Sequence, residues 1–144
     1  MDSRAQIERL IFLYAERIDA GDFEGVADLL ADAVVKASGA VVADTRAAVL
    51  RMYETSTRRY EDGTPHTKHV TTNVVVEIDE TAGTATARSY FTVLQSLPDF
   101  PLQVIIAGRY RDRFARESGT WRFKERDLIP ELYGDLSRHL LIDL

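Results

Sequence analysis

The sequence predicts an α+β fold in which a curved antiparallel sheet wraps around amino-terminal helices and forms a cone with an internal pocket. Two observations support this prediction. Apolar residues recur at helical spacing through most of residues 1–58, whereas residues 64–130 contain alternating, β-branched runs separated by turn residues. We therefore expect one domain over residues 1–144, with 1–58 mainly helical, 64–130 an antiparallel sheet and 131–144 a tail.

Three helices are expected in the amino-terminal part. Ser3, with a glutamine three residues later, has the spacing of a capping box and marks the first start, and Gly21 marks the end of that helix. Asp22 is suited to cap a short second helix, and Asp44 or Thr45 a third. The apolar stripes of these helices contain Ile7, Leu10, Ile11, Tyr14 and Ile18, then Phe23, Val26, Ala27 and Leu30, then Ala48, Val49, Met52 and Tyr53.

The sheet is expected to contain a small hairpin within residues 33–43 and four longer strands. Residues 96–101 are expected to form a loop, because their two prolines cannot donate to a sheet ladder. The leucines of the tail are compatible with a short helix. The long strands are predicted at residues 67–79, 84–95, 102–116 and 121–129.

The composition narrows the classes of function. A net charge of -5 disfavours nucleic-acid binding, and the absence of cysteine excludes disulfides, thiolate metal sites and a cysteine nucleophile. No apolar stretch is long enough to cross a bilayer, and the chain begins with an amphipathic helix rather than the apolar core of a signal peptide. We expect a cytoplasmic protein that binds neither nucleic acid nor membrane.

Asp19 and His69 are the first candidates for acid–base chemistry. Histidine titrates closest to neutral pH, and a carboxylate that holds one ring nitrogen makes the other a better general base. The residues alone leave two ordinary alternatives open. Asp19 is also suited to be a solvated residue at the end of a helix, and His69 an incidental histidine on the surface of a strand.

Strand alternation predicts that His69, Thr71 and Asn73 share one semi-polar face, as the wall of a pocket would require. His66 would point to the opposite face, and His139 is isolated in the tail. We therefore expect no metal site and no cofactor.

Tyr14 and Tyr53 lie at core-like positions of helices. Most such tyrosines are packing residues whose hydroxyl finds a partner, and the functional alternative is a phenol that hydrogen-bonds a substrate oxygen. In a regular helix the side chains of Tyr14 and Asp19 would be about 140° apart. Both would reach one cavity only if the helix end bends or the pocket is wide.

Arg126 is a candidate for stabilising a developing anion or a leaving group. Basic residues alternate along the last two strands, and the usual arrangement places them on the solvated face with the aromatic residues inside. This alternation opposes an inward Arg126 on the side of Trp121, unless a β-bulge intervenes.

These positions together resemble the SnoaL-like branch of the nuclear transport factor two-like (cystatin-like cone) superfamily. Within that branch they are most similar to scytalone dehydratase, bile acid 7α-dehydratase and hexachlorocyclohexane dehydrochlorinase. The resemblance covers the chain to about residue 130 and is carried by Ile7, Leu10, Tyr14, Asp19-Ala20-Gly21-Asp22-Phe23, His69, Thr72-Asn73, Gly108-Arg109-Tyr110-Arg111-Asp112, Gly119-Thr120-Trp121-Arg122-Phe123 and Arg126.

The resemblance implies roles for these residues. Asp19 and His69 match a dyad that removes a proton from carbon, and Arg126 matches an arginine that enters the pocket of the dehydrochlorinase. Tyr14 falls where a tyrosine or lysine lines the pocket, and Asn73 matches an asparagine that follows the histidine in many members. The chain departs from its relatives in two places. It lacks a second well-placed histidine, and Tyr90 or Ser89 occupies the region of an additional acid in the bile acid enzyme.

The predicted function is a cofactor-independent lyase or isomerase, of the dehydratase type, that acts on a small apolar ring compound such as a steroid, polyketide or terpenoid. Tyr53 and Tyr90 join Asn73 as candidate substrate-binding residues. One alternative is a non-catalytic binding protein or a small subunit of a ring-hydroxylating dioxygenase. A polyketide cyclase or an epoxide hydrolase ranks lower, because Asp19 has no clear second acid on the same wall. The exposed sheet face suggests a homodimer or homotrimer.

Overall fold

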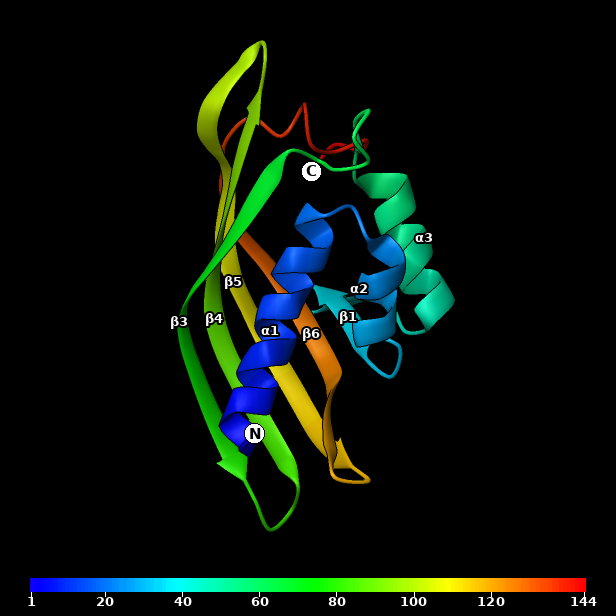
Figure 1. Ribbon diagram of the computed structural model, residues 1–144, viewed down its shortest axis with the longest axis vertical. Coiled ribbons are helices and arrows are strands. Elements are labelled where there is room, and N and C mark those ends of the chain that lie inside the picture. The colour runs from blue at the N-terminus through cyan, green and yellow to red at the C-terminus, as the bar shows by residue number, and fades with distance from the viewer.

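The computed structural model describes all 144 residues and confirms the α+β cone, with three helices covering one face of a six-stranded curved sheet (Figure 1). The helices are α1 (Ser3–Asp19), α2 (Phe23–Leu29) and α3 (Arg46–Ser56). The strands are β1 (Val34–Ala37), β2 (Ala40–Ala43), β3 (Thr67–Asp79), β4 (Thr84–Leu97), β5 (Phe100–Glu117) and β6 (Thr120–Tyr133). None of the helices has the length and apolar character needed to span a membrane.

The sheet has the order β2-β1-β6-β5-β4-β3. The prediction of an entirely antiparallel sheet is wrong for one pair of strands. The short strand β1 runs parallel to β6, because the chain enters it from the helices rather than from a hairpin with β6. The expected loop at 96–101 is only a tight turn, in which Leu97 of β4 pairs with Phe100 of β5. Pro101 is tolerated there because the pairing of β5 with β6 begins farther along, at Ile106.

Local sequence sets the helix ends. The carboxylate of Asp2, one residue before the predicted start, accepts from the backbone N–H of Ala5 and caps α1. Thr45 caps α3 by accepting from the N–H of Ala48. Gly21 follows α1 with a φ of 72°, and a side chain there would overlap the carbonyl oxygen of Gly63. The glycine thus lets the loop after α3 approach the end of α1.

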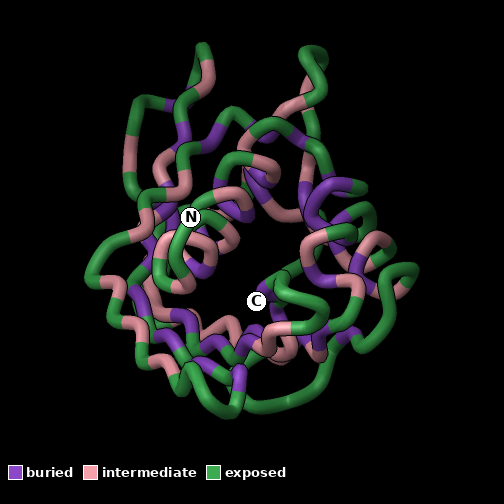
Figure 2. The backbone as a smooth tube through the Cα atoms, turned by 60° about the horizontal axis from the view of Figure 1, so that its bottom comes forward, coloured by how far each residue is buried: buried purple, intermediate pink, exposed green.

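The core lies between the helices and the inner face of the sheet, where the buried parts of the tube in Figure 2 gather. Ile7, Ile11 and Ile18 of α1 are buried there with Phe23 of α2. The side chains of β4 alternate between buried and more exposed positions, so its polar residues Ser89 and Gln95 point into the cone with the apolar ones.

The tail forms no helix. Strand β6 continues to Tyr133, and the N–H of Gly134 then donates to the carbonyl oxygen of Ile105 at 2.8 Å. Farther along, Leu140 forms an isolated β-bridge with Thr57, just after α3. The tail is therefore attached by backbone pairing to both the sheet and the helical layer.

Candidate active site

Asp19 and His69 form a hydrogen-bonded pair at the end of α1. The Nδ1 atom of His69 lies 2.7 Å from Oδ1 of Asp19. The same carboxylate accepts from the backbone N–H of His69 at 2.8 Å and from the hydroxyl of Thr67 at 2.9 Å. The side chains of His69 and Asp19 are 9% and 12% exposed. The pair is thus held by three hydrogen bonds and keeps a small exposed surface.

The local sequence explains why the pair forms. Asp19 is the last residue of α1. Thr67 and His69 lie two residues apart at the start of β3, so both point to the inner side of the sheet, facing the helix. Burial acts to raise the pKa of Asp19, but the hydrogen bond and the charge of His69 outweigh it and lower that pKa. An ionised Asp19 favours the tautomer with the proton on Nδ1, which leaves Nε2 as the basic nitrogen.

The pair opens into a groove between α1 and β3, which we call the α1–β3 groove. Its volume is about 450 Å³, which is sufficient for a small organic molecule. Phe12 and Ala15 provide its apolar wall, and Glu16 and Lys68 lie at its polar border. The complete lining is Phe12, Ala15, Glu16, Asp19, Ala20, Lys68, His69 and Thr71.

Arg126 points into the cone, because the β-bulge that is the exception to the alternation is present. The register of β5 and β6 shifts between Arg113, which pairs with Glu125, and Phe114, which pairs with Phe123. The extra residue of this bulge turns Arg126 to the buried side, where Phe123 also lies. Its guanidinium carbon is 3.6 Å from the ring centroid of Tyr110.

Arg126 belongs to a wholly buried cluster, the arginine–tyrosine cluster, that consists of Arg126, Asp112, Tyr14, Tyr53 and Tyr110. Nε of Arg126 lies 3.3 Å from Oδ1 of Asp112, within ion-pair distance although without the geometry of a hydrogen bond. The guanidinium also lies 4.1 Å from the ring centroid of Tyr14. The hydroxyls of Tyr14 and Tyr53 hydrogen-bond each other. The sequence analysis gave Asp112 no role of its own, and it did not predict its pairing with Arg126.

The electrostatics of this cluster follow from burial. Desolvation raises the pKa of Asp112 to about 6, although Arg126 opposes the rise. Desolvation likewise raises the pKa of Tyr14, so this phenol stays protonated and able to donate a hydrogen bond. The charge of Asp19 contributes to the same rise, so the dyad and the cluster lie within electrostatic reach of each other.

The structure does not bring Asn73 and Tyr90 to the dyad. The predicted alternation of β3 ends at a bulge between Thr72 and Val75, where Asn73 has a φ of 54° and is exposed. Tyr90 is 53% exposed, and its neighbour Ser89 is the residue that turns inward. Asn73 and Tyr90 instead line a depression on the outer face, together with Glu131 and other polar residues. Tyr53, by contrast, lies inside with Tyr14.

Two buried polar residues differ from the sequence interpretation: His139, expected to be isolated in the tail, lies beside His69, and Gln95 was given no role. The ring centroid of His139 lies 6.3 Å from that of His69. Gln95 follows the inward alternation of β4 and was detectable from that pattern, whereas His139 lies in an irregular tail without periodicity. His66 pairs with Asp62 instead, and no group of three or more potential ligand side chains is placed to hold a metal ion.

The profile of the SnoaL-like domain matches residues 1–127. The chain belongs to the SnoaL-like family. This confirms the resemblance that the scattered polar residues carried. Among curated proteins, none matches this sequence.

Solved structures with the same fold come from Novosphingobium aromaticivorans. A scytalone dehydratase-like protein has 25% identity and a TM-score of 0.70, with 92% of this chain and 86% of that one covered. A nuclear transport factor two-like protein with a cystatin-like fold has 23% identity and a TM-score of 0.73, with 94% and 85% covered. The beta subunit of an aromatic-ring-hydroxylating dioxygenase-like enzyme has 19% identity and a TM-score of 0.69, with 90% of each chain covered.

Proposed function

We propose that this SnoaL-like protein is a cofactor-independent lyase or isomerase that removes a proton from a carbon atom of a small, largely apolar ring compound. The observation that carries the proposal is the Asp19–His69 pair, with its 2.7 Å contact at the wall of the α1–β3 groove. The family membership and the likeness to a scytalone dehydratase-like protein support the same reaction class.

In the proposed step, Nε2 of His69 takes the proton of a C–H bond. The electron pair of that bond forms a carbon–carbon double bond as a leaving group departs from the neighbouring carbon with its own bonding pair. In an isomerisation the electrons move instead onto a carbonyl oxygen. Asp19 stabilises the imidazolium that forms, through its contact with Nδ1.

The arginine–tyrosine cluster has a supporting role in this proposal. Tyr14 and Tyr53 are neutral phenols that share a hydrogen bond behind the groove, and one of them would donate to a substrate oxygen that reaches past the dyad into the cone. Arg126 has its charge opposed by Asp112 and is covered by aromatic rings, so we assign it to positioning Tyr14 rather than to binding a leaving group.

The test uses α-tetralone, a ring ketone with exchangeable hydrogens next to its carbonyl, in deuterated water. We expect the protein to accelerate deuterium incorporation, and His69→Ala to lower the rate by about a hundredfold or more. Asp19→Asn should also lower it, because the imidazolium loses its counter-charge. His66→Ala changes a histidine outside the groove and should leave the rate unchanged. Equal rates for His69→Ala and the unmodified protein, or no acceleration at all, would show that the mechanism is wrong.

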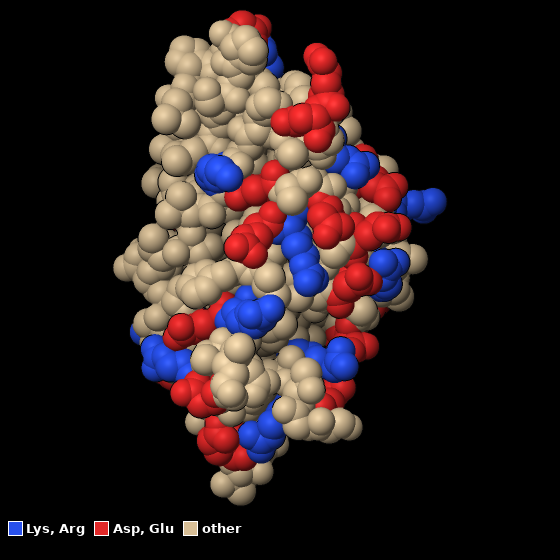
Figure 3. All heavy atoms as spheres, viewed as in Figure 1, with Lys and Arg blue, Asp and Glu red and all other residues tan.

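A second proposal concerns assembly. The outer sheet face exposes Val70, Tyr90, Val104 and Leu132, and the pairing of Val70 with Thr92, Thr92 with Ala107 and Ala107 with Leu132 forms a continuous row across four strands. Figure 3, which views the molecule from the helix side, also shows few charged side chains at the upper left, where the β4–β5 hairpin lies. We infer that a second copy covers this face in a homodimer or homotrimer.

Sedimentation equilibrium checks the assembly. Val104→Lys should shift the protein toward the monomer, whereas Thr84→Lys, at the far end of β4, should not. A monomeric unmodified protein would contradict the homo-oligomer. In that case, absence of exchange activity as well would favour the alternative of a small subunit, in keeping with the likeness to a dioxygenase beta subunit.

A further inference from the structure

The carboxyl-terminal segment 134–141, here called the tail segment, crosses the end of the cone where α1 and α3 end (Figure 1). Its backbone is tied to the residues around the end of α3. The carbonyl oxygen of His139 accepts from the N–H of Arg58 at 2.8 Å, and the N–H of Leu141 donates to the carbonyl oxygen of Ser56 at 2.9 Å. These bonds hold the tail segment in one path over the inner residues.

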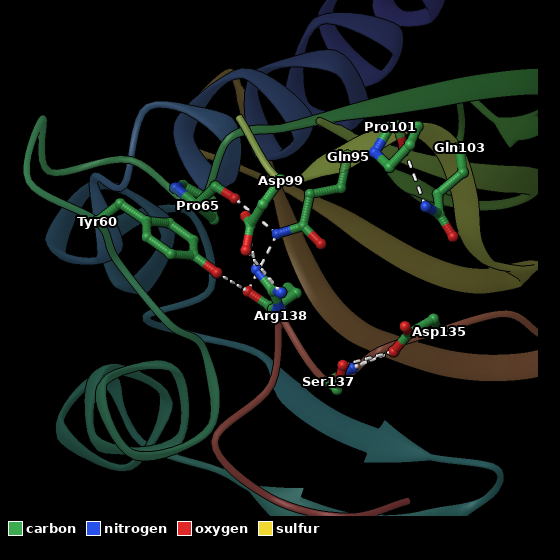
Figure 4. A network of polar contacts seen from close by, with 9 residues as sticks. All are labelled: Tyr60, Pro65, Gln95, Asp99, Pro101, Gln103, Asp135, Ser137 and Arg138. Carbon is green, nitrogen blue, oxygen red and sulfur yellow. Dashed lines mark hydrogen bonds and ion pairs between the residues drawn. The ribbon is translucent and has the colours of Figure 1, made fainter. Parts of the chain in front are cut away.

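Arg138 fixes the tail segment from the other side (Figure 4). Its guanidinium forms two hydrogen bonds with the carboxylate of Asp99, at 2.9 and 3.0 Å. Its carbonyl oxygen accepts from the side-chain amide of Gln95 at 3.1 Å and from the hydroxyl of Tyr60. Gln95 also donates to the carbonyl oxygen of Pro65, two residues before β3. The residue before His139 is thus anchored to the turn after β4 and to the chain that leads into the dyad strand.

The consequence of this anchoring is that the ring of His139 faces the ring of His69. The centroids are 6.3 Å apart with an angle of 63° between the planes, so the two rings meet edge to face. His139 is 6% exposed, and its Nδ1 is buried without a hydrogen-bond partner. Buried polar nitrogens nearly always have a partner, so this atom is available to hydrogen-bond a bound molecule.

Burial is the main reason why the ring of His139 stays neutral. Burial, and to a lesser extent the charge of His69, lower the pKa of His139 to about 4 against the opposing charge of Asp19. A neutral imidazole keeps one N–H donor and one acceptor nitrogen. His139 is therefore unsuited to take the proton that His69 removes, and suited to hydrogen-bond an oxygen atom.

We propose that His139 is a substrate-binding residue that donates a hydrogen bond to the oxygen of a ring ketone or ring alcohol, next to the carbon that faces His69. The proposal rests on the function proposed above and adds the substrate class. With a ketone, the electrons of the C–H bond form a carbon–carbon double bond as the carbonyl electrons move onto oxygen. The proton stays on Nε2 of His69, and the resulting enolate oxygen receives the N–H of His139.

The experiment compares the binding of α-tetralone with that of tetralin, which has the same ring skeleton without the oxygen. Ligand-observed nuclear magnetic resonance measures both affinities. We expect the unmodified protein to bind the ketone more tightly than tetralin. The variant His139→Phe keeps a ring of similar size and should lower this ratio of affinities roughly fivefold. His139→Gln keeps an N–H donor and should retain part of it. His66→Gln is the matched control and should retain all of it.

Three results would overturn the proposal. The unmodified protein has no preference for the ketone or binds neither probe, or His139→Phe leaves the preference intact. In the third, His139→Phe weakens the binding of both probes equally, which would indicate a packing role. Thermal unfolding verifies that each variant is folded. His69→Ala separates this proposal from the proposed function. If both are right, this variant stops deuterium exchange and keeps the ketone preference. If exchange persists in His69→Ala while the preference still depends on His139, only the proposed function fails.

Discussion

Two acid–base pairs lie in the interior of the cone, Asp19–His69 and Asp112–Arg126, and their surroundings differ. In the Asp19–His69 pair, the carboxylate accepts three hydrogen bonds and the histidine retains access to a groove. In the Asp112–Arg126 pair, both side chains are fully buried, and neither has a hydrogen bond of good geometry although they lie 3.3 Å apart.

The difference shows how hydrogen bonding and burial act in opposite directions on one residue type. The pKa of Asp19 is lowered because hydrogen bonds and the charge of His69 outweigh desolvation. The pKa of Asp112 is raised to about 6 because desolvation outweighs the attraction of Arg126. The first carboxylate is therefore ionised and available to support a base, and the second is a structural group with a costly charge.

The largest expected effect comes from breaking the buried pair. Arg126→Met should lower the free energy of unfolding by about 3 to 5 kcal/mol at neutral pH, because Asp112 is then left buried without a counter-charge. Urea denaturation measures this change. In the dyad, His69→Leu should cost less, since Asp19 keeps the hydroxyl of Thr67 and a backbone N–H as partners.

A double variant tests the cause of that loss. Arg126→Met combined with Asp112→Leu removes both charges and should recover most of the stability, because apolar side chains of similar volume replace a buried ion pair at little cost. If the double variant is as unstable as Arg126→Met alone, packing against Tyr14 and Tyr110 rather than charge pairing holds the cluster together.

The pH dependence of stability distinguishes the two carboxylates with a somewhat smaller effect. Asp112 has a pKa of about 6 in the folded protein against an ordinary value of 3.8, so between these values the folded state keeps a proton that the unfolded chain has lost. Its contribution to the free energy of unfolding should therefore fall by about 3 kcal/mol as pH rises from about 4 to above 6. Asp19 acts in the opposite direction, since its lowered pKa gives stability that is lost as pH falls.

Asp112→Asn isolates this contribution, because the variant keeps every other titrating group, including Glu125 and Asp127, whose charges also raise the pKa of Asp112. The stability advantage of the unmodified protein over the variant should shrink as pH rises from 4 to above 6, as measured by urea denaturation at each pH. Parallel pH profiles would mean that Asp112 stays ionised throughout and that the two pairs are electrostatically alike.

Periodicity made most of the fold predictable from the sequence. The strand expected at 67–79 coincides with β3, and the other three long strands extend beyond their predicted ends by one to four residues. Irregularities were not predictable, because a bulge depends on pairing between distant segments rather than on local pattern. The same kind of event turned Arg126 inward on β6 and Asn73 outward on β3.

For the candidate site, sequence reasoning selected residues that regular elements position. Asp19 ends a helix and His69 lies on the inner alternation of a strand, so their meeting followed from the order of the elements. His139 has no such periodicity, and only the contacts of Arg138 and the pairing of Leu140 with Thr57 determine where its ring lies. The position of a tail that is held by long-range contacts cannot be predicted from its local sequence.

The smallest expected effect sharpens the comparison inside the arginine–tyrosine cluster. Tyr14→Phe or Tyr53→Phe alone should lower the free energy of unfolding by about 1 kcal/mol, because each leaves the other buried hydroxyl without its partner. The double variant should lose no more than either single one, since no unpaired hydroxyl remains, and the resulting coupling energy is obtained from urea denaturation of all four proteins. Additive losses would show that each hydroxyl is stabilised independently, for example by its own interaction with Arg126. The cluster would then resemble the carboxylate of Asp19, in which both oxygens have hydrogen-bond partners.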